Sequence, residues 1–331
     1  MAQRVGQLLM VDCPSTSVGE ATATAITKYH VGSVILDGNS TLGVEGTAAV
    51  VARLQRLVAH GPKLFVSTDQ EGGQVQRLRG PDFSDIPSAV QQGTEDPGKL
   101  QIATTQWAGE LRAAGVNVDL APVLDTVPAN SGPNPPIGDL QREYGSDPKA
   151  VTSHGLAVMK GISKADIDPT VKHFPGLGRV AGNTDTTAGV RDTVTTRHDA
   201  YLAPFAAAIK AGAPFVMMST AIYTRIDPDH PAAFSRKIVT GMLRGDLGFT
   251  GVVISDDLGA AKQVSGYSVG DRAVAFISAG GDMVLTVDAG QATAMTQAVL
   301  AKANSDPGFK ALVDAAAMRV LQAKQASGLL S

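Results

Sequence analysis

The chain has 331 residues, of which 44% are apolar and 18% charged, and its formal net charge at pH 7 is −3. This composition excludes an intrinsically disordered chain, and the weak charge argues against nucleic acid as a ligand. No apolar run reaches the roughly 18 residues of a membrane-spanning helix, and the single cysteine, Cys13, excludes an internal disulfide and disfavours a cysteine-based metal site.

Short β-branched runs alternate with segments of helical period along the chain. The predicted strands, in chain order, lie at 7–11, 34–36, 64–66, 116–120, 169–171, 215–218, 252–254 and 283–285. The predicted helices lie at 46–60, 100–114, 151–163, 200–211, 237–244 and 271–279, with further helices toward the C-terminus. Strand–helix repetition with short joins predicts a parallel sheet, whose strands read as continuous apolar runs because both faces are covered.

About eight such units predict a (β/α)8 barrel of the TIM type, which we expect to occupy residues 1–331 as a single domain. An open nucleotide-binding sheet is the alternative architecture. It is disfavoured because no Gly-x-Gly-x-x-Gly follows the first strand and no Walker lysine is present. Segments 80–98, 126–149 and 176–198 are rich in Gly, Pro, Asp and Thr, which predicts long loops.

Polar residues directly follow several predicted strands. The ones suited to chemistry are Asp69, Glu71, Asp125, Lys172, His173, Ser219, Asp256 and Asp257. Each has an ordinary explanation taken alone, such as a helix N-cap for Asp257 or a structural hydrogen bond for His173. In a barrel, however, the C-terminal strand ends share one rim, so together these residues predict one cleft. Two rim carboxylates suit glycoside hydrolysis, because positive charge develops on the sugar in the transition state.

Three motifs resemble those of the bacterial β-N-acetylglucosaminidases of glycoside hydrolase family 3, in their single-domain form. They are Asp69-Gln-Glu-Gly-Gly-Gln-Val-Gln-Arg77, Lys172-His-Phe-Pro-Gly176 and Val253-Ile-Ser-Asp256-Asp-Leu258. Their order and spacing extend the resemblance over nearly the whole chain. The resemblance implies a retaining enzyme that hydrolyses terminal β-linked N-acetylglucosamine from cell-wall (peptidoglycan) fragments through a covalent glycosyl-enzyme.

The resemblance also assigns roles to individual residues. Asp256 matches the nucleophile of the family, which leaves Asp257 a structural or capping role. The residues that match sugar-binding positions are Asp69, Arg77, Arg142, Lys172 and His173, with Arg142 in the run Arg142-Glu-Tyr-Gly145. These roles are physically sensible, because lysine and arginine donate to sugar hydroxyl groups while a carboxylate accepts from them.

The loop after Gly176 departs from the family pattern, which reads His-Gly and later Asp-Ser-His, the last histidine and the aspartate forming the general acid/base. Here Leu177 replaces the first histidine, Asp185 matches the aspartate, and Thr187 stands where the catalytic histidine is expected. A threonine hydroxyl does not donate a proton near neutral pH as imidazole does. We therefore predict that the glycine-rich loop 176–190 is mobile and acts through Asp185. His198 is the weaker candidate.

Other functions stay open at this stage. One is a β-glucosidase or a glycoside phosphorylase of the same fold, since phosphate as acceptor depends less on a general base. Another is a catalytically impaired sugar-binding protein, which the missing histidine suggests and the retained Asp256 argues against. We expect a carbohydrate partner and neither a metal nor an organic cofactor, while the oligomeric state is open. The N-terminus shows no secretion signal, but a composition rich in Ala, Gly and Thr resembles that of bacteria in which related enzymes are often exported. An exported or cell-envelope location is therefore favoured over a cytoplasmic one.

Overall fold

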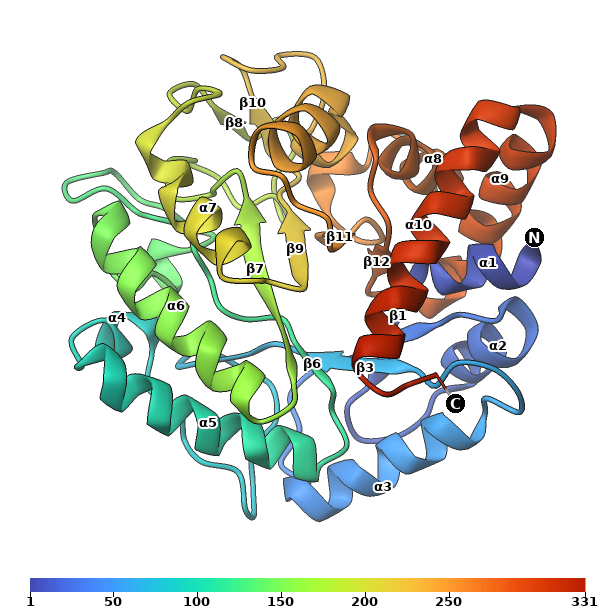
Figure 1. The fold of residues 1–331 in the computed structure, drawn as a ribbon, viewed down its shortest axis with the longest axis horizontal. Coiled ribbons are helices and arrows are strands. Elements are labelled where there is room, and N and C mark those ends of the chain that lie inside the picture. The colour runs from blue at the N-terminus through green and yellow to red at the C-terminus, as the bar shows by residue number, and fades with distance from the viewer. Residues whose placement is uncertain (331) are drawn as a thin grey trace.

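A computed structural model describes residues 1–330 and contains eight parallel strands arranged around one axis (Figure 1). They are β1 (Leu9–Pro14), β2 (Ser33–Asp37), β3 (Phe65–Thr68), β6 (Val118–Asp119), β7 (Asp168–Phe174), β9 (Phe215–Met218), β11 (Val252–Ser255) and β12 (Val284–Thr286). The strands pair in the order β11-β9-β7-β6-β3-β2-β1-β12. A bridge between Ile254 and Met283 then joins β11 to β12 and nearly closes the ring. The predicted (β/α)8 barrel is confirmed.

Helices surround the strands (Figure 1). The α-helices are α1 (Ala2–Gln7), α2 (Glu20–Tyr29), α3 (Gly43–Arg56), α4 (Ala89–Gln92), α5 (Pro97–Ala113), α6 (Pro148–Lys164), α7 (Ala203–Lys210), α8 (Val269–Ala279), α9 (Ala292–Ser305) and α10 (Pro307–Ala326). A π-helix spans Lys237–Asp246, and short 3-10 turns occupy Gly138–Leu140, Ala200–Leu202, Ala232–Phe234, Lys262–Val264 and Ala289–Gln291. Two small two-stranded sheets are also present: β4 (Gln70–Gly72) pairs with β5 (Val75–Gln76) in an antiparallel hairpin, and β8 (Arg191–Asp192) pairs with β10 (Ile222–Tyr223) in parallel.

Three helices begin at an Asp-Pro pair, at Asp96, Asp147 and Asp306. In each case the aspartate carboxylate accepts hydrogen bonds from backbone N–H groups of the first turn, and the proline occupies the first helical position. Both features suit a helix start, because the first N–H groups have no partner within the helix and proline has no N–H to lose. Local sequence therefore determines where α5, α6 and α10 begin.

The predicted strands and helices agree with the structure except near the N-terminus, and the predicted loop 80–98 contains the short helix α4 and the start of α5. The first strand was predicted at 7–11, but Gln7 ends α1 and the strand is Leu9–Pro14. Helix α2 was not predicted, because its buried stripe consists only of Thr22, Ala25 and Ile26 and so gives a weak apolar period.

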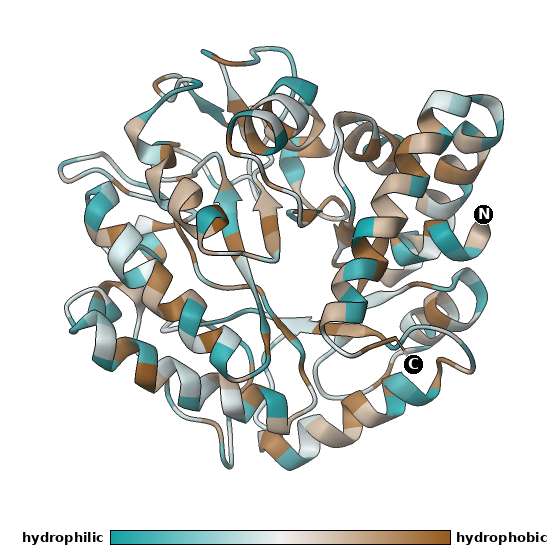
Figure 2. Ribbon diagram, viewed as in Figure 1, coloured by the Kyte–Doolittle hydropathy of each residue, from teal (hydrophilic) through white to brown (hydrophobic). Residues whose placement is uncertain are grey.

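Apolar residues of the strands form the barrel core. Strands β3, β9 and β11 are buried at every position, and the rings of Phe65 and Phe215 meet edge to face at 5.3 Å inside the barrel. The surrounding helices show polar and apolar residues in alternation along their length (Figure 2), as expected for helices that bury one stripe. Among residues 1–330, no helix is long and apolar enough to cross a membrane.

Candidate active site

A cleft of about 340 Å³ lies at the C-terminal ends of the strands. It is lined by the residues predicted to react or to bind the sugar, namely Asp69, Arg77, Arg142, Lys172, His173, Asp185 and Asp256, whereas Glu71, Asp125 and Ser219, also predicted at this rim, do not line it. Lys172 and His173 lie in β7, Asp69 directly follows β3, and Asp256 directly follows β11. Because these strands are parallel, their ends meet at one rim, and residues up to 187 positions apart in sequence share one cavity.

The hairpin of β4 and β5 brings Arg77 to the same rim. Its turn contains Gly72, which has a positive φ of 99° and whose added Cβ would lie 2.3 Å from the Pro87 carbonyl oxygen. Only glycine fits there, both in conformation and in space. The chain then returns beside its starting point, and the Arg77 N–H donates to the Asp69 carbonyl at 3.1 Å.

Buried ion pairs connect residues that follow β3 and β6 with a residue of β7. The Lys172 ammonium lies 2.6 Å from Asp69 Oδ1 and 2.6 Å from Glu71 Oε1. Arg142 donates two hydrogen bonds to the Glu71 carboxylate, at 2.8 and 2.7 Å. Burial opposes the charge on Glu71, but Arg142 and Lys172 outweigh it and lower the pKa of Glu71 to about 2. Glu71 therefore stays ionised and holds both cations in place.

His173 is fixed by a second carboxylate, that of the fully buried Asp125. The Asp125 carboxylate accepts from His173 Nδ1 at 2.7 Å and from the backbone N–H groups of His173 and Leu177 at 3.2 and 2.8 Å. With Nδ1 engaged, the other ring nitrogen of His173 is the one left for a ligand in the cleft. Asp125 thus orients the imidazole and ties it to the start of the loop 176–190.

The adjacent carboxylates of Asp256 and Asp257 have different surroundings. Asp257 accepts hydrogen bonds from four backbone N–H groups, those of Gly259, Ala260, Ala261 and Val287, at 2.8–3.0 Å. Within residues 1–330, Asp256 accepts only one, from the Asp257 N–H at 2.9 Å. Asp257 is therefore used to shape the loop after β11, whereas Asp256 keeps oxygen lone pairs available in the cleft.

Asp185 reaches the cleft from the loop 176–190, together with Asn183 and Thr184. Desolvation of its carboxyl and the negative charges of Asp256 and Asp257 raise the pKa of Asp185 to about 6. Thr187 is exposed and does not line the cleft. His198 is also not brought to the site, since it lies in a different hollow beside Arg197 and Met242.

Two further aspartates belong to the site but were not singled out from the sequence. Asp37, the last residue of β2, lines the cleft, and its position just after an apolar run was the signal that could have identified it. Asp119, at the end of β6, is buried behind Lys172 and accepts from the Gln70 N–H at 3.2 Å. Burial raises the pKa of Asp119 to about 7, although the charge of Lys172 opposes this rise.

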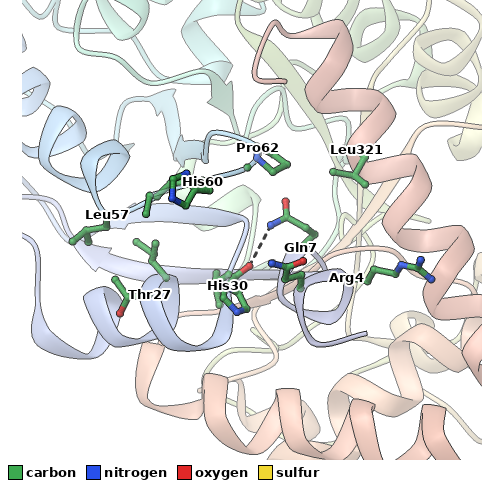
Figure 3. A pocket seen from close by; sticks show the side chains of 14 residues that line it. Arg4, Gln7, Thr27, His30, Leu57, His60, Pro62 and Leu321 are labelled. Atoms are coloured by element: carbon green, nitrogen blue, oxygen red, sulfur yellow. Dashed lines mark hydrogen bonds between the residues drawn. The ribbon is translucent and has the colours of Figure 1, made fainter. Parts of the chain in front are cut away.

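A larger hollow of about 480 Å³ lies at the opposite end of the barrel (Figure 3). It is formed where α1, α2 and α3 end, so it faces the N-terminal ends of β1–β3. Its polar residues include His30, His60 and Arg4, but Arg4 already pairs with Asp314 at 2.7 Å. No aspartate or glutamate lines it. The smaller cleft is therefore the candidate active site, because it alone combines carboxylates with cations at the catalytic face of a barrel.

The cleft holds no arrangement suited to a metal ion. Across the described part of the chain, no three His, Cys, Asp or Glu residues are grouped so that they could bind one. The carboxylates near Lys172 are instead neutralised by Lys172 and Arg142.

Comparisons with known proteins agree on one family. Residues 1–323 match the family described as "Glycosyl hydrolase family 3 N terminal domain". A β-hexosaminidase from Stenotrophomonas maltophilia is 38% identical over 238 residues, which cover 70% of this chain and 68% of that protein. The crystal structure of a β-N-acetylhexosaminidase from Beutenbergia cavernae is 53% identical with a TM-score of 0.96 and covers 98% of each chain. A family 3 β-N-acetylglucosaminidase from a Paenibacillus species is 31% identical with a TM-score of 0.91, over 99% of this chain and 63% of that chain.

Proposed function

Because this chain belongs to glycoside hydrolase family 3, we propose that it is a retaining β-N-acetylglucosaminidase with Asp256 as the nucleophile. The chain is a glycoside hydrolase of the β-hexosaminidase type. The proposal adds the reacting residues, namely Asp256 attacking the sugar and Asp185 exchanging the proton. Asp69, Arg77, Arg142, Lys172 and His173 bind the terminal sugar.

The observation that carries the proposal is the contrast between Asp256 and Asp257. A nucleophile needs a free oxygen directed at the anomeric carbon, and a carboxylate surrounded by four N–H donors has little left to offer. Asp256 has one such donor and Asp257 has four. This supports Asp256 as the attacking group and Asp257 as the residue that shapes the loop around it.

The sugar is held in our proposal by charges that are already in place before it binds. Glu71 orients Lys172 and Arg142. Their remaining N–H groups can therefore donate to sugar hydroxyl groups without the side chains having to become ordered on binding. The Asp69 side chain is 21% exposed and pairs with Lys172 through Oδ1, which leaves Oδ2 to accept from a hydroxyl. Such preorganisation lowers the entropy cost of binding.

The reaction then proceeds in two displacements. An Asp256 carboxylate oxygen forms a bond to the anomeric carbon while the bond from that carbon to the aglycone oxygen breaks, and the departing oxygen takes the proton from Asp185. A water molecule next attacks the anomeric carbon and gives a proton back to Asp185 as the bond to Asp256 breaks. Asp185 and Asp256 end as they began, and the sugar keeps its β configuration.

We propose water and not phosphate as the acceptor. The acceptor approaches between Asp185 and Asp256, with Asp257 alongside, and all three line the cleft. Asp256 is esterified at this stage, so a phosphate dianion would meet the carboxylates of Asp185 and Asp257 there, while Lys172 and Arg142 already pair with Glu71. Electrostatic repulsion therefore disfavours phosphorolysis.

The test is a panel of 4-nitrophenyl β-glycosides, each with and without phosphate. We expect 4-nitrophenyl N-acetylglucosaminide to be cleaved far faster than the glucoside, with free N-acetylglucosamine as product and no stimulation by phosphate. A 2-fluoro sugar should label Asp256. Formation of N-acetylglucosamine 1-phosphate would overturn the choice of water, and faster cleavage of the glucoside would overturn the substrate.

For the natural substrate we propose cell-wall fragments that end in β-linked N-acetylglucosamine. Support comes from the motifs around Asp69, Lys172 and Asp256, which resemble those of bacterial enzymes with this substrate. Comparing kcat/KM for a disaccharide of N-acetylglucosamine on N-acetylmuramic acid with that for chitobiose tests the proposal. A clear preference for chitobiose would contradict it.

A further inference from the structure

The loop 176–190 is tied to the barrel at both ends by buried amide side chains. Asn134 Nδ2 donates to the carbonyl oxygens of Leu177 and Val180 at 2.9 and 2.8 Å. Gln263 makes a two-bond clamp on Val190, accepting from its N–H at 2.8 Å and donating to its carbonyl at 3.1 Å. Both amides are buried. Opening either end would therefore leave polar groups unpaired, which costs free energy.

The same segment that carries Gln263 also holds the backbone at Asp185. The Gln263 N–H donates to the Thr184 carbonyl at 3.0 Å, and the Lys262 N–H donates to the Asp185 carbonyl at 3.0 Å. Gln263 thus contacts the loop before Asp185 and, through Val190, after it. Residues 185–189, between these contacts, are exposed.

A short series of hydrogen bonds links this clamp to the nucleophile. Asp257, next to Asp256, accepts from the N–H groups of residues 259–261. The 3-10 turn Lys262–Val264 follows immediately and makes the contacts to Thr184 and Asp185. The segment 257–264 therefore sets where Asp185 stands relative to Asp256, although Gln263 itself does not line the cleft.

We propose that Gln263 is a positioning residue for proton transfer, holding Asp185 at the cleft through its clamp on Val190 and its contact with Thr184. This inference rests on the proposed role of Asp185 as the acid/base. The same contacts also restrict which part of the loop 176–190 can move. Gly178 packs so closely that an added Cβ would lie 1.9 Å from the Thr126 carbonyl oxygen, so the start of the loop is held against the barrel as well.

The experiment replaces Gln263 with methionine, which keeps the side-chain volume and removes both hydrogen bonds to Val190. We expect Gln263→Met to lower turnover of a phenyl N-acetylglucosaminide by about 10- to 100-fold, because a misplaced acid serves a poor leaving group badly. A dinitrophenyl glycoside needs little protonation, so its turnover should change less than about 2-fold. Amide hydrogen exchange in residues 185–190 should become faster.

The matched control is Gln55→Met. Gln55 makes the same two-bond clamp, on Leu64, with both bonds at 3.0 Å, but at the other end of the barrel. Gln55→Met should leave the ratio of phenyl glycoside turnover to dinitrophenyl glycoside turnover unchanged. Equal losses on both substrates in Gln263→Met, or no loss on either, would overturn the inference. Asp185→Ala in the same assay distinguishes failure of the acid role from failure of the positioning role. If the loss of turnover in Asp185→Ala does not depend on the leaving group, the proposed acid role is wrong. If that loss depends on the leaving group but the loss in Gln263→Met does not, only the positioning role is wrong.

Discussion

The two sides of the cleft are built differently. On one side, Glu71 joins Lys172 and Arg142 in buried ion pairs that form when the barrel folds. On the other side, Asp185 lies at the start of an exposed stretch, where its backbone accepts from the Lys262 N–H and donates to the Asn183 side chain, while its own carboxylate makes no ion pair among the described residues. In the proposed mechanism, sugar binding therefore depends on groups fixed in the folded core, whereas proton transfer depends on a segment with fewer buried contacts. Changes on the first side should affect all substrates alike, and changes on the second should depend on the leaving group.

The largest effect is expected at Asp256, which lies directly after β11 in the same cleft. Asp256→Ala removes the proposed nucleophile and should lower kcat by a factor on the order of 10³ or more for every aryl glycoside, with an unchanged thermal midpoint. Asp257→Ala leaves four backbone N–H groups without their acceptor and should mainly lower stability. Steady-state kinetics and thermal unfolding of both variants measure this. Full activity in Asp256→Ala would refute the assignment.

A second prediction concerns Asp185, whose pKa is raised to about 6 by desolvation and by Asp256 and Asp257. The donor must be protonated, so turnover of poor leaving groups should fall as the pH rises through about 6. Near neutral pH, protonated Asp185 is therefore more abundant than it would be for an ordinary aspartate. Asp185→Ala should remove this limb of the pH profile and slow poor leaving groups by about 10²- to 10⁴-fold.

The matched measurement for Asp185→Ala uses a dinitrophenyl glycoside, which should be slowed little. Azide should restore turnover by attacking the glycosyl-enzyme without needing a base. If the variant is equally impaired on both substrates and azide has no effect, Asp185 is not the acid/base. The dependence on the leaving group would then not distinguish the Asp185 side of the cleft from the Glu71 side.

A third prediction tests the ion pairs through Glu71→Gln. Losing this carboxylate leaves Lys172 and Arg142 buried with too little negative charge, and should cost about 3–5 kcal/mol of stability at pH 7. The pKa of Glu71 is lowered to about 2 in the folded protein, so its contribution is present above its ordinary pKa of about 4.5 and is lost as the pH falls toward 2. Urea unfolding at several pH values should therefore show the difference between variant and wild type shrinking below about pH 4.5.

The control for Glu71→Gln is Glu110→Gln. Among residues 1–330, the Glu110 carboxylate accepts only from the Ser84 N–H and hydroxyl, at 2.8 and 2.6 Å. Its replacement should cost about 1 kcal/mol, as for an ordinary hydrogen bond. Similar losses in the two variants would show that the buried cations do not depend on Glu71.

The smallest effect is expected for the sugar-binding cations, and Arg77 has a close control in Arg79. Arg77 lines the cleft, its Nε is buried without a partner among the described residues, and its terminal nitrogen reaches Asn39 only at 3.4 Å. Arg77→Ala should weaken binding of N-acetylglucosamine by about 1–3 kcal/mol, measured by inhibition or calorimetry. Arg79 is engaged with Asp85 and the Gly73 carbonyl, outside the cleft, so Arg79→Ala should bind the sugar normally. Equal weakening in both would contradict a direct role for Arg77.

Much of the fold and of the candidate site could be predicted from local patterns. Apolar runs followed by polar residues marked the strands and their ends, as at Val66 to Asp69 and Ile254 to Asp256. Once the strands were placed in a parallel barrel, chain topology alone required those ends to share a rim. The missed helix α2 shows the limit of this reasoning, since its few buried residues leave no clear period.

The sequence by itself thus determined the barrel and most of the charged residues at its rim, because strands and the polar residues that follow them are recorded in local runs of the chain. Only the tertiary structure decided which of these groups neutralise or hold one another. Glu71 and Arg142 are 71 positions apart, and Val190 and Gln263 are 73 apart. The adjacent residues Asp256 and Asp257 differ in role for the same reason, since one of the four donors around Asp257 comes from Val287 in a different loop. Hydrogen bonds and ion pairs act over about 3 Å in space whatever the separation along the chain, so no local pattern records them.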